Sequence, residues 1–377
     1  MNPRIYLDFN ASTPIDPSVL QVILEALQTE CGNPSSIHLH GRQARQKLEE
    51  CRESIAHFLQ VKPQEIFFTS GGTEGAHTLM HGILLQKPFG HLITSSAEHA
   101  CVYQTAKELE KKGYAVTFLS PGEWGAVKPE AILEAIQPDT RLIALMAVNN
   151  ETGVKTDWEA IAAVAEKFNI PFVLDGVSLL GKETFKLPKG VAAAFFSGHK
   201  IYTPKGVGFC CCRQSMKLLP TFAGGSQEFN RRAGTENFSG IIGLAKAIHI
   251  IAQDQTSITG HLEKMRGLLE STLLSQLTDV QVNGRGPRIV NTANLTFHGV
   301  DGEALLMKLD LAGVSVSHGS ACSSGALEPS RILLNMGLPL SAARSAIRFS
   351  VGRTTSAAEI ERASAIIINA VNELRKS

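Results

Sequence analysis

The chain has 377 residues, which is enough for about two domains. Hydrophobic residues make up 44% and charged residues 19%, a composition that suits a large globular enzyme with a well-buried core. The formal net charge is +1 and no basic block stands out, so nucleic acid is not expected as a partner. No apolar run approaches the roughly 20 residues of a membrane-spanning helix, so no membrane association is expected.

Cysteine usage and the N-terminus favour a reducing compartment. The seven cysteines are an odd number and include no Cys-x-x-Cys pair, which argues against a disulfide framework or a zinc ribbon. The N-terminus reaches a predicted strand at once and has no apolar core of a signal peptide. We therefore expect a cytoplasmic location.

The first two thirds of the chain alternate between strands and helices. The chain opens with an expected strand at 4–9, a helix that begins at residue 17 and a turn-rich loop at 31–41. Apolar residues then recur along one face of an amphipathic helix at 41–59. Further strands are expected at 65–69, 91–94, 114–119, 141–148, 170–175, 191–196 and 206–212, and helices at 73–86, 99–112, 129–136 and 157–168. This order predicts a mainly parallel sheet with helices on both faces and a ligand at the carboxyl ends of its strands.

The pattern changes after about residue 260. A long helix is expected at 261–277, a strand near 291–297 and a helix at 302–311. A strand at 314–317, a Gly- and Ser-rich loop at 318–329, a strand at 346–350 and a final helix from residue 356 follow. We predict a large domain at 15–260 and a smaller α+β domain formed by 1–14 and 261–377.

Lys200 lies just past the end of the apolar strand at 191–196, after Ser197, Gly198 and His199. Desolvation of an ammonium group is costly, and it lowers the pKa of the amine and makes it a usable nucleophile. A Schiff-base lysine that holds pyridoxal phosphate (PLP) needs this setting, and Ser197 and His199 beside it could bind the phosphate. Taken alone, this stretch favours the alternative of an exposed loop lysine, because most lysines are solvated.

Two other strand ends carry candidate ligands. Residues 67–74, FFTSGGTE, form a strand, a glycine turn and a helix start, whose exposed amides favour a phosphate. An ordinary strand-to-helix turn is the alternative. Asp175 ends the strand at 170–175, where it could pair with a pyridinium nitrogen or cap the next segment.

Two motifs resemble known binding sites but lack a residue that such a site needs. Residues 176–183, GVSLLGKE, fit a P-loop except that Glu183 stands where a hydroxyl for magnesium is needed, so nucleotide hydrolysis is disfavoured. His77 and His81 are four residues apart on a predicted helix, which is a possible metal pair. No third ligand is evident in the sequence, so packing or surface histidines are favoured and no metal site is expected.

Three stretches nearer the C-terminus also contain candidate groups. The Gly- and Arg-rich stretch 224–237 could bind anions or form a solvated interface loop. Cys322 lies in GSACSSG, whose small residues expose its sulfur for nucleophilic attack; an incidental loop cysteine is the alternative, and His318 could assist the thiol. Arg348 lies in an apolar strand and needs a carboxylate partner from the protein or a substrate.

Together these stretches resemble the cysteine desulfurases, fold-type I PLP enzymes that supply sulfur to iron–sulfur clusters. The resemblance covers nearly the whole chain, in order. It comprises YLDFNAST, GNPSSIHLHG, FTSGGTE, EH at 98–99, VNNETG, the strand that ends in Asp175, SGHKIYTPKGVG, GGSQEFNRRAGTEN, GSACSSGALEPS and IRFSVGR. It implies an α/β fold with a mainly parallel seven-stranded sheet in the large domain.

The resemblance also implies the cofactor and its ligands. Pyridoxal 5'-phosphate would be bound covalently by Lys200, stacked on the catalytic His99 and paired through its ring nitrogen with Asp175. Asn150 and Ser178 would contact the cofactor as well. The phosphate would be held by Gly72, Thr73, Ser197, His199 and, from the other subunit of a homodimer, Thr235.

The reaction implied is the conversion of L-cysteine to L-alanine. Arg348 would bind the substrate carboxylate, with Asn150 close by, and Lys200 would shuttle the α-proton. Cys322 would take the sulfur as a persulfide and pass it to a protein acceptor such as an iron–sulfur scaffold protein.

Several positions depart from the family pattern. Ser178 replaces a usual Gln that bonds the ring oxygen of PLP, and Gly176 and Val177 stand where alanines are usual. Phe9, His77 and His318 are also unusual. Two alternatives therefore stay open. One is another PLP enzyme of this fold, such as a selenocysteine lyase or an aminotransferase, the latter disfavoured by the Cys322 loop. The other is a catalytically divergent paralogue that acts as a scaffold.

Overall fold

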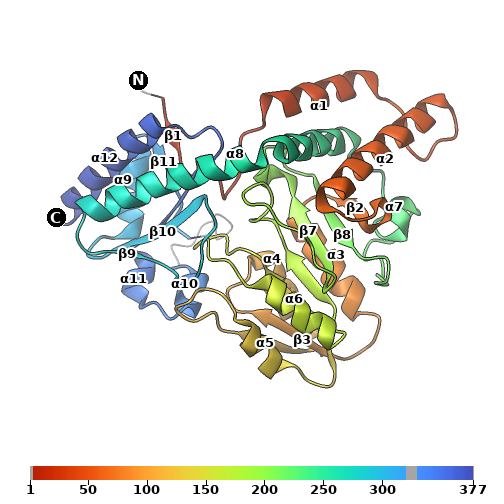
Figure 1. The fold of residues 1–377 in the computed structure, drawn as a ribbon, viewed down its shortest axis with the longest axis horizontal. Coiled ribbons are helices and arrows are strands. Elements are labelled where there is room, and N and C mark those ends of the chain that lie inside the picture. The colour runs from red at the N-terminus through yellow and green to blue at the C-terminus, as the bar shows by residue number, and fades with distance from the viewer. Residues whose placement is uncertain (1–2, 320–328, 377) are drawn as a thin grey trace.

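The computed structural model describes residues 3–319 and 329–376. Its larger sheet has seven strands in the order β2-β8-β7-β6-β5-β3-β4 (Figure 1). The strands are β2 (Ile66–Thr69), β3 (His91–Ser95), β4 (Ala115–Leu119), β5 (Thr140–Met146), β6 (Phe172–Asp175), β7 (Val191–Ser197) and β8 (Gly208–Cys212). Strand β8 is antiparallel to β2 and β7, and the other pairs are parallel. The predicted α/β fold with a mainly parallel seven-stranded sheet is confirmed.

Helices cover both faces of this sheet, as predicted. One face packs against α3 (Gly72–Leu84) and α4 (Ala100–Lys111). The core on the other face includes side chains from α1 (Pro17–Thr29), α2 (Leu39–Leu59), α5 (Pro129–Ala135), α6 (Trp158–Lys167) and the first half of α8 (Phe238–Gln276). Side chains alternate between the faces with the period of two that a strand imposes: Phe195 joins the first core and Phe196 the second. Buried sheets of this kind therefore read as continuous apolar runs.

A smaller sheet lies beside the first. Its strands run antiparallel in the order β12-β10-β9, and a short parallel pair, β1 with β11, lies next to it. The strands are β1 (Ile5–Tyr6), β9 (Val280–Val282), β10 (Thr292–Phe297), β11 (Val314–Ser315) and β12 (Ala346–Ser350). The helices of this part are α9 (Gly302–Leu311), α10 (Arg331–Asn335), α11 (Leu340–Arg344) and α12 (Ala357–Leu374). The first and last strands of the chain thus lie in the same half of the molecule (Figure 1).

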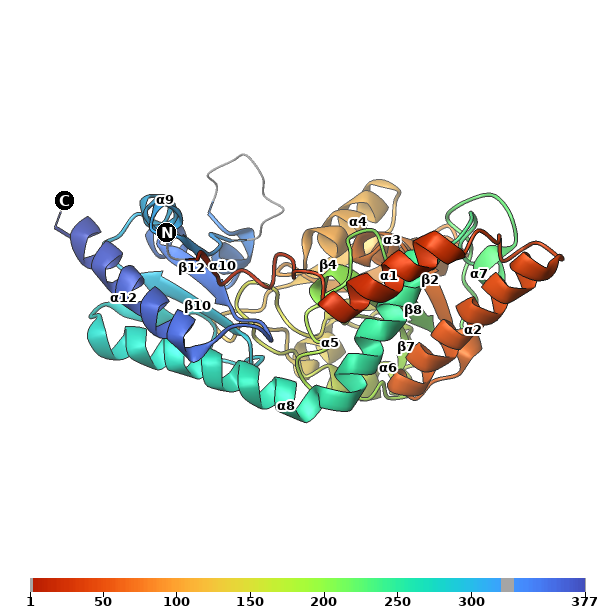
Figure 2. The same cartoon turned by 90° about the horizontal axis from the view of Figure 1, so that it is seen from above.

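Most predicted elements begin and end within two residues of the observed ones. Two predictions were wrong. The first strand spans Ile5–Tyr6 rather than 4–9, and the long helix begins at Phe238 rather than 261. Helix α8 runs past both halves of the molecule (Figure 2) and contributes Ile241 to one core and Leu262 to the other. In the sequence, a polar stretch separates the residues that enter the two cores, so the apolar pattern does not indicate one continuous helix.

Short elements complete the fold. They are 3-10 turns at Pro63–Glu65 and Gly198–Lys200 and the helical turn α7 (Gln227–Asn230). Among the described residues, no helix combines the length and apolarity needed to cross a membrane.

Candidate active site

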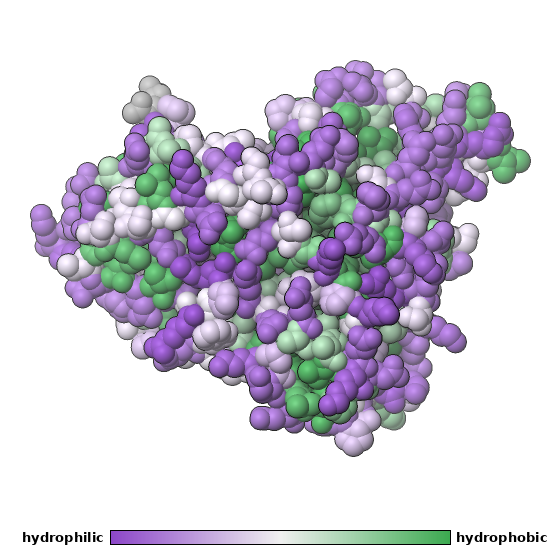
Figure 3. Space-filling view, in the orientation of Figure 1, coloured by the Kyte–Doolittle hydropathy of each residue, from purple (hydrophilic) through white to green (hydrophobic). Residues whose placement is uncertain are grey.

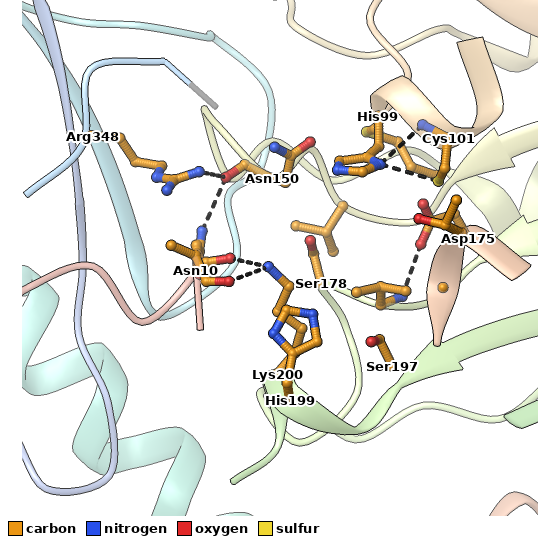
Figure 4. A pocket seen from close by; sticks show the side chains of 16 residues that line it. Asn10, His99, Cys101, Asn150, Asp175, Ser178, Ser197, His199, Lys200 and Arg348 are labelled. Carbon is orange, nitrogen blue, oxygen red and sulfur yellow. Dashed lines mark hydrogen bonds between the residues drawn. The ribbon is translucent and has the colours of Figure 1, made fainter. Parts of the chain in front are cut away.

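A cavity of about 170 Å³ lies at the carboxyl ends of the parallel strands. Its wall contains ten of the residues that the sequence singled out, drawn from the two sheets and the loops that follow them (Figure 4). They are Gly72, Thr73, His99, Asn150, Asp175, Ser178, Ser197, His199, Lys200 and Arg348. The expectation that a ligand site forms at these strand ends is thus matched by a cavity in the same place.

Lys200 ends the 3-10 turn that follows β7. The turn is tight: a Cβ atom on Gly198 would lie 2.2 Å from the hydroxyl oxygen of Thr203, so only glycine fits there. The Lys200 ammonium donates to the backbone carbonyls of Asn10 and Ala11, the latter at 2.8 Å. The amine is therefore half-buried and is held against the N-terminal segment, at the edge of the cavity (Figure 4).

Asp175 ends β6 and is 6% exposed. Its Oδ1 accepts a hydrogen bond of 2.9 Å from the backbone N–H of Val177. Burial raises the pKa of Asp175 from 3.8 to about 6, against the opposing effects of that hydrogen bond and of Lys200. A cationic N–H group in the cavity would favour the ionised carboxylate.

Glu98 is 1% exposed and is close enough to Asp175 to interact with its charge. Burial, and then the charge of Asp175, raise its pKa well above the ordinary value. One of its carboxyl oxygens has no hydrogen-bond partner among the described residues. Burial and the charge of Asp175 therefore both favour the protonated form of Glu98.

His99 is the N-cap of α4. Its Nδ1 accepts a hydrogen bond of 3.2 Å from the backbone N–H of Cys101. Burial, and then the positive charge of Lys200, lower the pKa of His99 to about 4. The imidazole is therefore neutral at pH 7 and carries its proton on Nε2, which leaves a planar, uncharged ring on the cavity wall.

The N-terminus of α3 forms an anion-binding surface. Gly71 precedes it with φ of 152°, a conformation that favours glycine, and Gly72 and Thr73 present the helix-start amides. A Cβ atom on Gly72 would approach Val177 Cγ2 to 3.1 Å, so the backbone passes close to the opposite wall. Ser197, which is buried, completes this end of the cavity. Such a helix start favours a phosphate.

His199 also faces this region. Its Nδ1 lies 3.3 Å from the hydroxyl oxygen of Ser12. Burial, and then the charge of Lys200, lower the pKa of His199 to about 4. The neutral ring can donate one hydrogen bond to an anion while its other nitrogen is satisfied by the hydroxyl.

Arg348 lies in β12 and is 1% exposed. Its Nη2 donates to Asp8 Oδ1 at 2.7 Å, and its Nη1 donates to the backbone carbonyl of Asn150 at 3.1 Å. The predicted carboxylate partner is therefore present within the protein. The Nε of Arg348 and the Oδ1 of Asn150 are both buried and have no hydrogen-bond partner among the described residues. The two side chains lie next to each other (Figure 4), so the cavity retains capacity for a polar ligand here.

Two predicted residues are not part of this wall. Thr235 is exposed and lines a separate small pocket together with Ser70 and Arg232. Cys322 lies outside the described residues. His318, which was expected to assist the thiol, has its Nε2 2.8 Å from the backbone carbonyl of Arg344.

Sequence reasoning missed two residues that support the site. Asn10 accepts from Lys200 through its carbonyl and donates to the carbonyl of Asn150 at 3.1 Å, so it joins both sides of the cavity. Lys182, from the rejected P-loop motif, is 7% exposed and donates to the carbonyl of Lys200 at 2.6 Å. Asn10 falls in the YLDFNAST motif, which could have marked it, whereas nothing in the sequence indicated that Lys182 is buried.

Comparisons with known proteins agree with this geometry. The class-V aminotransferase family matches residues 5–363. The chain belongs to the class-V aminotransferases, in their cysteine desulfurase branch. A curated relative, the cysteine desulfurase IscS of Dictyoglomus turgidum, is 38% identical over 379 residues, covering 100% of this chain and 96% of the relative.

Solved structures give the same family. A NifS-like protein has a TM-score of 0.91 and 32% identity, covering 98% of this chain and 100% of the other. The protein SspA, solved in complex with cysteine, has a TM-score of 0.82 and 31% identity, covering 93% of this chain and 100% of the other. The family assignment made from the sequence motifs is confirmed.

Proposed function

We propose that this cysteine desulfurase family member uses PLP to convert L-cysteine to L-alanine and to transfer the sulfur to Cys322 as a persulfide. One observation carries the proposal: four side chains with the required chemistry line the same cavity. They are Lys200, Asp175, His99 and Arg348. These four side chains supply an amine, a buried carboxylate, a neutral ring and a cation, which are the groups that the reaction needs. A solved relative in complex with cysteine supports the substrate.

The residues present fit PLP. A buried carboxylate at Asp175 suits a protonated ring nitrogen, the neutral imidazole of His99 suits an aromatic ring, and the start of α3 suits a phosphate. Asn150 Oδ1 is a buried acceptor without a partner among the described residues, and a bound polar group would satisfy it. Ser178 lies on the cavity wall, where we propose that it contacts the cofactor through its shorter side chain.

When bound, PLP supplies an electron sink that makes the α-proton of the substrate acidic. Lys200 Nζ is proposed to take and return that proton as general base and acid. Arg348 holds the substrate carboxylate. The Cys322 thiolate attacks the substrate sulfur: the new S–S bond forms as the Cβ–S bond breaks, and its electron pair stays with the carbon skeleton, which leaves as alanine.

The ends of the segment that holds Cys322 support its role. On one side, the backbone of Ser317 exchanges hydrogen bonds of 3.2 and 2.8 Å with Arg348. On the other side, the hydroxyl of Ser330 donates to the carboxylate of Glu151, the neighbour of Asn150. The described residues on either side of this segment, Ser317 and Ser330, are therefore attached beside Arg348 and Glu151.

Three further parts of the proposal concern the assembly and its setting. We propose a homodimer. It is supported by three exposed apolar side chains on α1, Leu20 (42% exposed), Leu24 (45%) and Leu27 (65%), and by the apolar tip of the α1–α2 connection (Figure 3). In that dimer Thr235 would reach the partner subunit's phosphate site. We also propose the division into 15–260 and 1–14 with 261–377, a cytoplasmic location, and a protein sulfur acceptor such as an iron–sulfur scaffold.

The test uses the purified protein and its Cys322→Ala variant. The visible absorbance of lysine-bound PLP is recorded first, and L-cysteine is then added while alanine and protein persulfide are assayed. We expect alanine and persulfide from the wild type and no persulfide from the variant. Alanine formation that persists with a normal persulfide in the variant would overturn the role of Cys322. Failure to retain PLP after reconstitution would overturn the enzyme proposal and favour a scaffold.

A further inference from the structure

Helices α3 and α4 bring three metal-ligating side chains together on the outer face of the large sheet. His77 and His81 lie one turn apart on α3, and Glu108 lies on the neighbouring α4 (Figure 2). One ligand atom from each of the three lies within 4.8 Å of the others. The sequence offered only the histidine pair, because the third side chain comes from a helix that is separate in the sequence.

The hydrogen bonding of His81 decides which of its nitrogens can bind a metal. Its Nδ1 lies 3.1 Å from the backbone carbonyl of His77. A carbonyl can only accept, so Nδ1 carries the proton and Nε2 of the neutral ring carries a lone pair. A backbone carbonyl that orients a histidine in this way is typical of metal-ligating imidazoles.

The lone pair of His81 faces a negative group. His81 is 2% exposed, and its Nε2 has no hydrogen-bond partner among the described residues. The nearest carboxylate oxygen, Glu108 Oε1, is 3.6 Å away. Two acceptors that face each other repel unless a proton or a cation lies between them.

Protonation of His81 is the less favourable way to relieve this repulsion. His81 is only 2% exposed, so a protonated ring there would be a charged group removed from water, which is costly. The rings of His77 and His81 are 3.9 Å apart between centroids, so a second positive charge there would be repelled. A cation shared with the Glu108 carboxylate avoids that cost.

We propose that His77, His81 and Glu108 bind a zinc-type divalent cation that joins α3 to α4. Two imidazoles and one carboxylate are a common zinc ligand set, with water as the fourth ligand. Tetrahedral zinc ligands about 2.1 Å from the metal lie about 3.4 Å from one another, close to the 3.6 Å between His81 and Glu108. His77 is half-buried and the side chain of Glu108 is 45% exposed, so both can adjust and water can enter.

The proposed site is separate from the cavity, because none of its three ligands lines the cavity wall. Its effect would be structural. Helix α3 begins at the amides proposed to hold phosphate, and α4 begins after His99. A metal that joins the two helices would fix the relative position of these two parts of the cavity.

One neighbouring charge competes with the metal. The ammonium of Lys112 lies 2.7 Å from the Glu108 carboxylate and would be displaced or repelled by a divalent cation. This competition makes a sharp prediction: Lys112→Met should bind zinc several-fold more tightly than the wild type. A histidine cluster that only packs between helices would show no such effect.

The test measures zinc binding to the full-length holoprotein by equilibrium dialysis and metal analysis, with Cys322→Ser as a background that removes the loop thiol. We expect one zinc per chain in both backgrounds. His77→Ala and Glu108→Gln should each weaken binding by at least the roughly 10- to 100-fold that loss of an outer-sphere partner costs. Both positions are partly exposed, so the variants should fold. Glu110→Gln, a carboxylate change on the same helix, is the matched control and should leave the affinity unchanged.

Three results would overturn the proposal. One is zinc affinity that is equal in the wild type, His77→Ala and Glu108→Gln proteins. Another is binding that disappears only when Cys322 is replaced, which would assign the metal to the thiol. Absence of binding at zinc concentrations up to 100 times those that saturate other two-histidine, one-carboxylate sites would count equally against it.

Discussion

Replacement of Asp175 by Asn is expected to stabilise the cofactor-free chain at neutral pH. Asp175 is 6% exposed, and burial raises its pKa from 3.8 to about 6. Between these pH values the folded chain binds more protons at this site than the unfolded chain, so the free energy of unfolding falls as pH rises, and the loss is complete above about pH 6. The difference in pKa corresponds to a cost of about 3 kcal/mol. Asn removes the charge and keeps an oxygen that can accept from Val177.

The assay is thermal unfolding of the cofactor-free wild type and of Asp175→Asn from pH 4.5 to pH 8. We expect similar melting temperatures at pH 4.5 and a higher one for the variant at pH 8, by several degrees. Asp16→Asn is a control of opposite sign. Although burial opposes it, hydrogen bonds from Ser18 and the charge of Arg353 lower the pKa of Asp16, so this variant should be less stable at pH 8.

The same Asp175→Asn variant should retain PLP less well than the wild type, because Asn cannot hold a proton on the ring nitrogen by charge. Cofactor retention after gel filtration measures this loss. The reasoning fails if Asp175→Asn destabilises the cofactor-free chain at pH 8. It fails equally if the difference in melting temperature does not change between pH 4.5 and pH 8.

Three further predictions concern other buried charges. Burial lowers the pKa of Lys182 from 10.5 to about 7, so wild-type stability should rise as pH increases from 7 to 10, and Lys182→Met should abolish that rise in denaturant unfolding. Glu228→Gln breaks a pair with Arg52 in which both side chains are at most 2% exposed, and should cost about 3–5 kcal/mol by calorimetry, part of which Arg52→Met should restore in the double variant. Arg348→Lys cannot keep both of its hydrogen bonds, and should raise KM for L-cysteine roughly tenfold with a smaller effect on kcat, as steady-state kinetics would measure.

The position of the cavity could be predicted from the sequence because most of the residues that line it lie at or just after the ends of strands. In a parallel sheet the carboxyl ends of the strands share one edge, so Asp175 at the end of β6 and Lys200 after β7 must lie near each other once the strands are recognised. The apolar runs that mark these strands are local features and need no knowledge of the remaining chain. The same reasoning explains why most element bounds were correct within two residues.

Contacts between distant segments could not be predicted in this way. Arg348 was recognised as needing a carboxylate, but its partner Asp8 lies 340 residues away in the sequence. Lys182 was read as part of a failed P-loop, because burial of a lysine against backbone carbonyls leaves no local pattern. Glu108 could not be recognised in the sequence as a neighbour of His81 for the same reason, because their contact depends on how α3 packs against α4.

The buried titratable groups also suit the proposed cofactor. Asp175 is ionised at pH 7 in a buried position, and His99 and His199 are held neutral by burial and by the charge of Lys200. The ionised Asp175 costs stability in the chain alone, whereas the two histidines cost little at pH 7 because an unfolded histidine is also mostly neutral there. Each of the three states suits one part of PLP. Because binding offsets costs that folding imposes, cofactor binding should stabilise the protein by more than its contacts at the surface of the cavity would suggest.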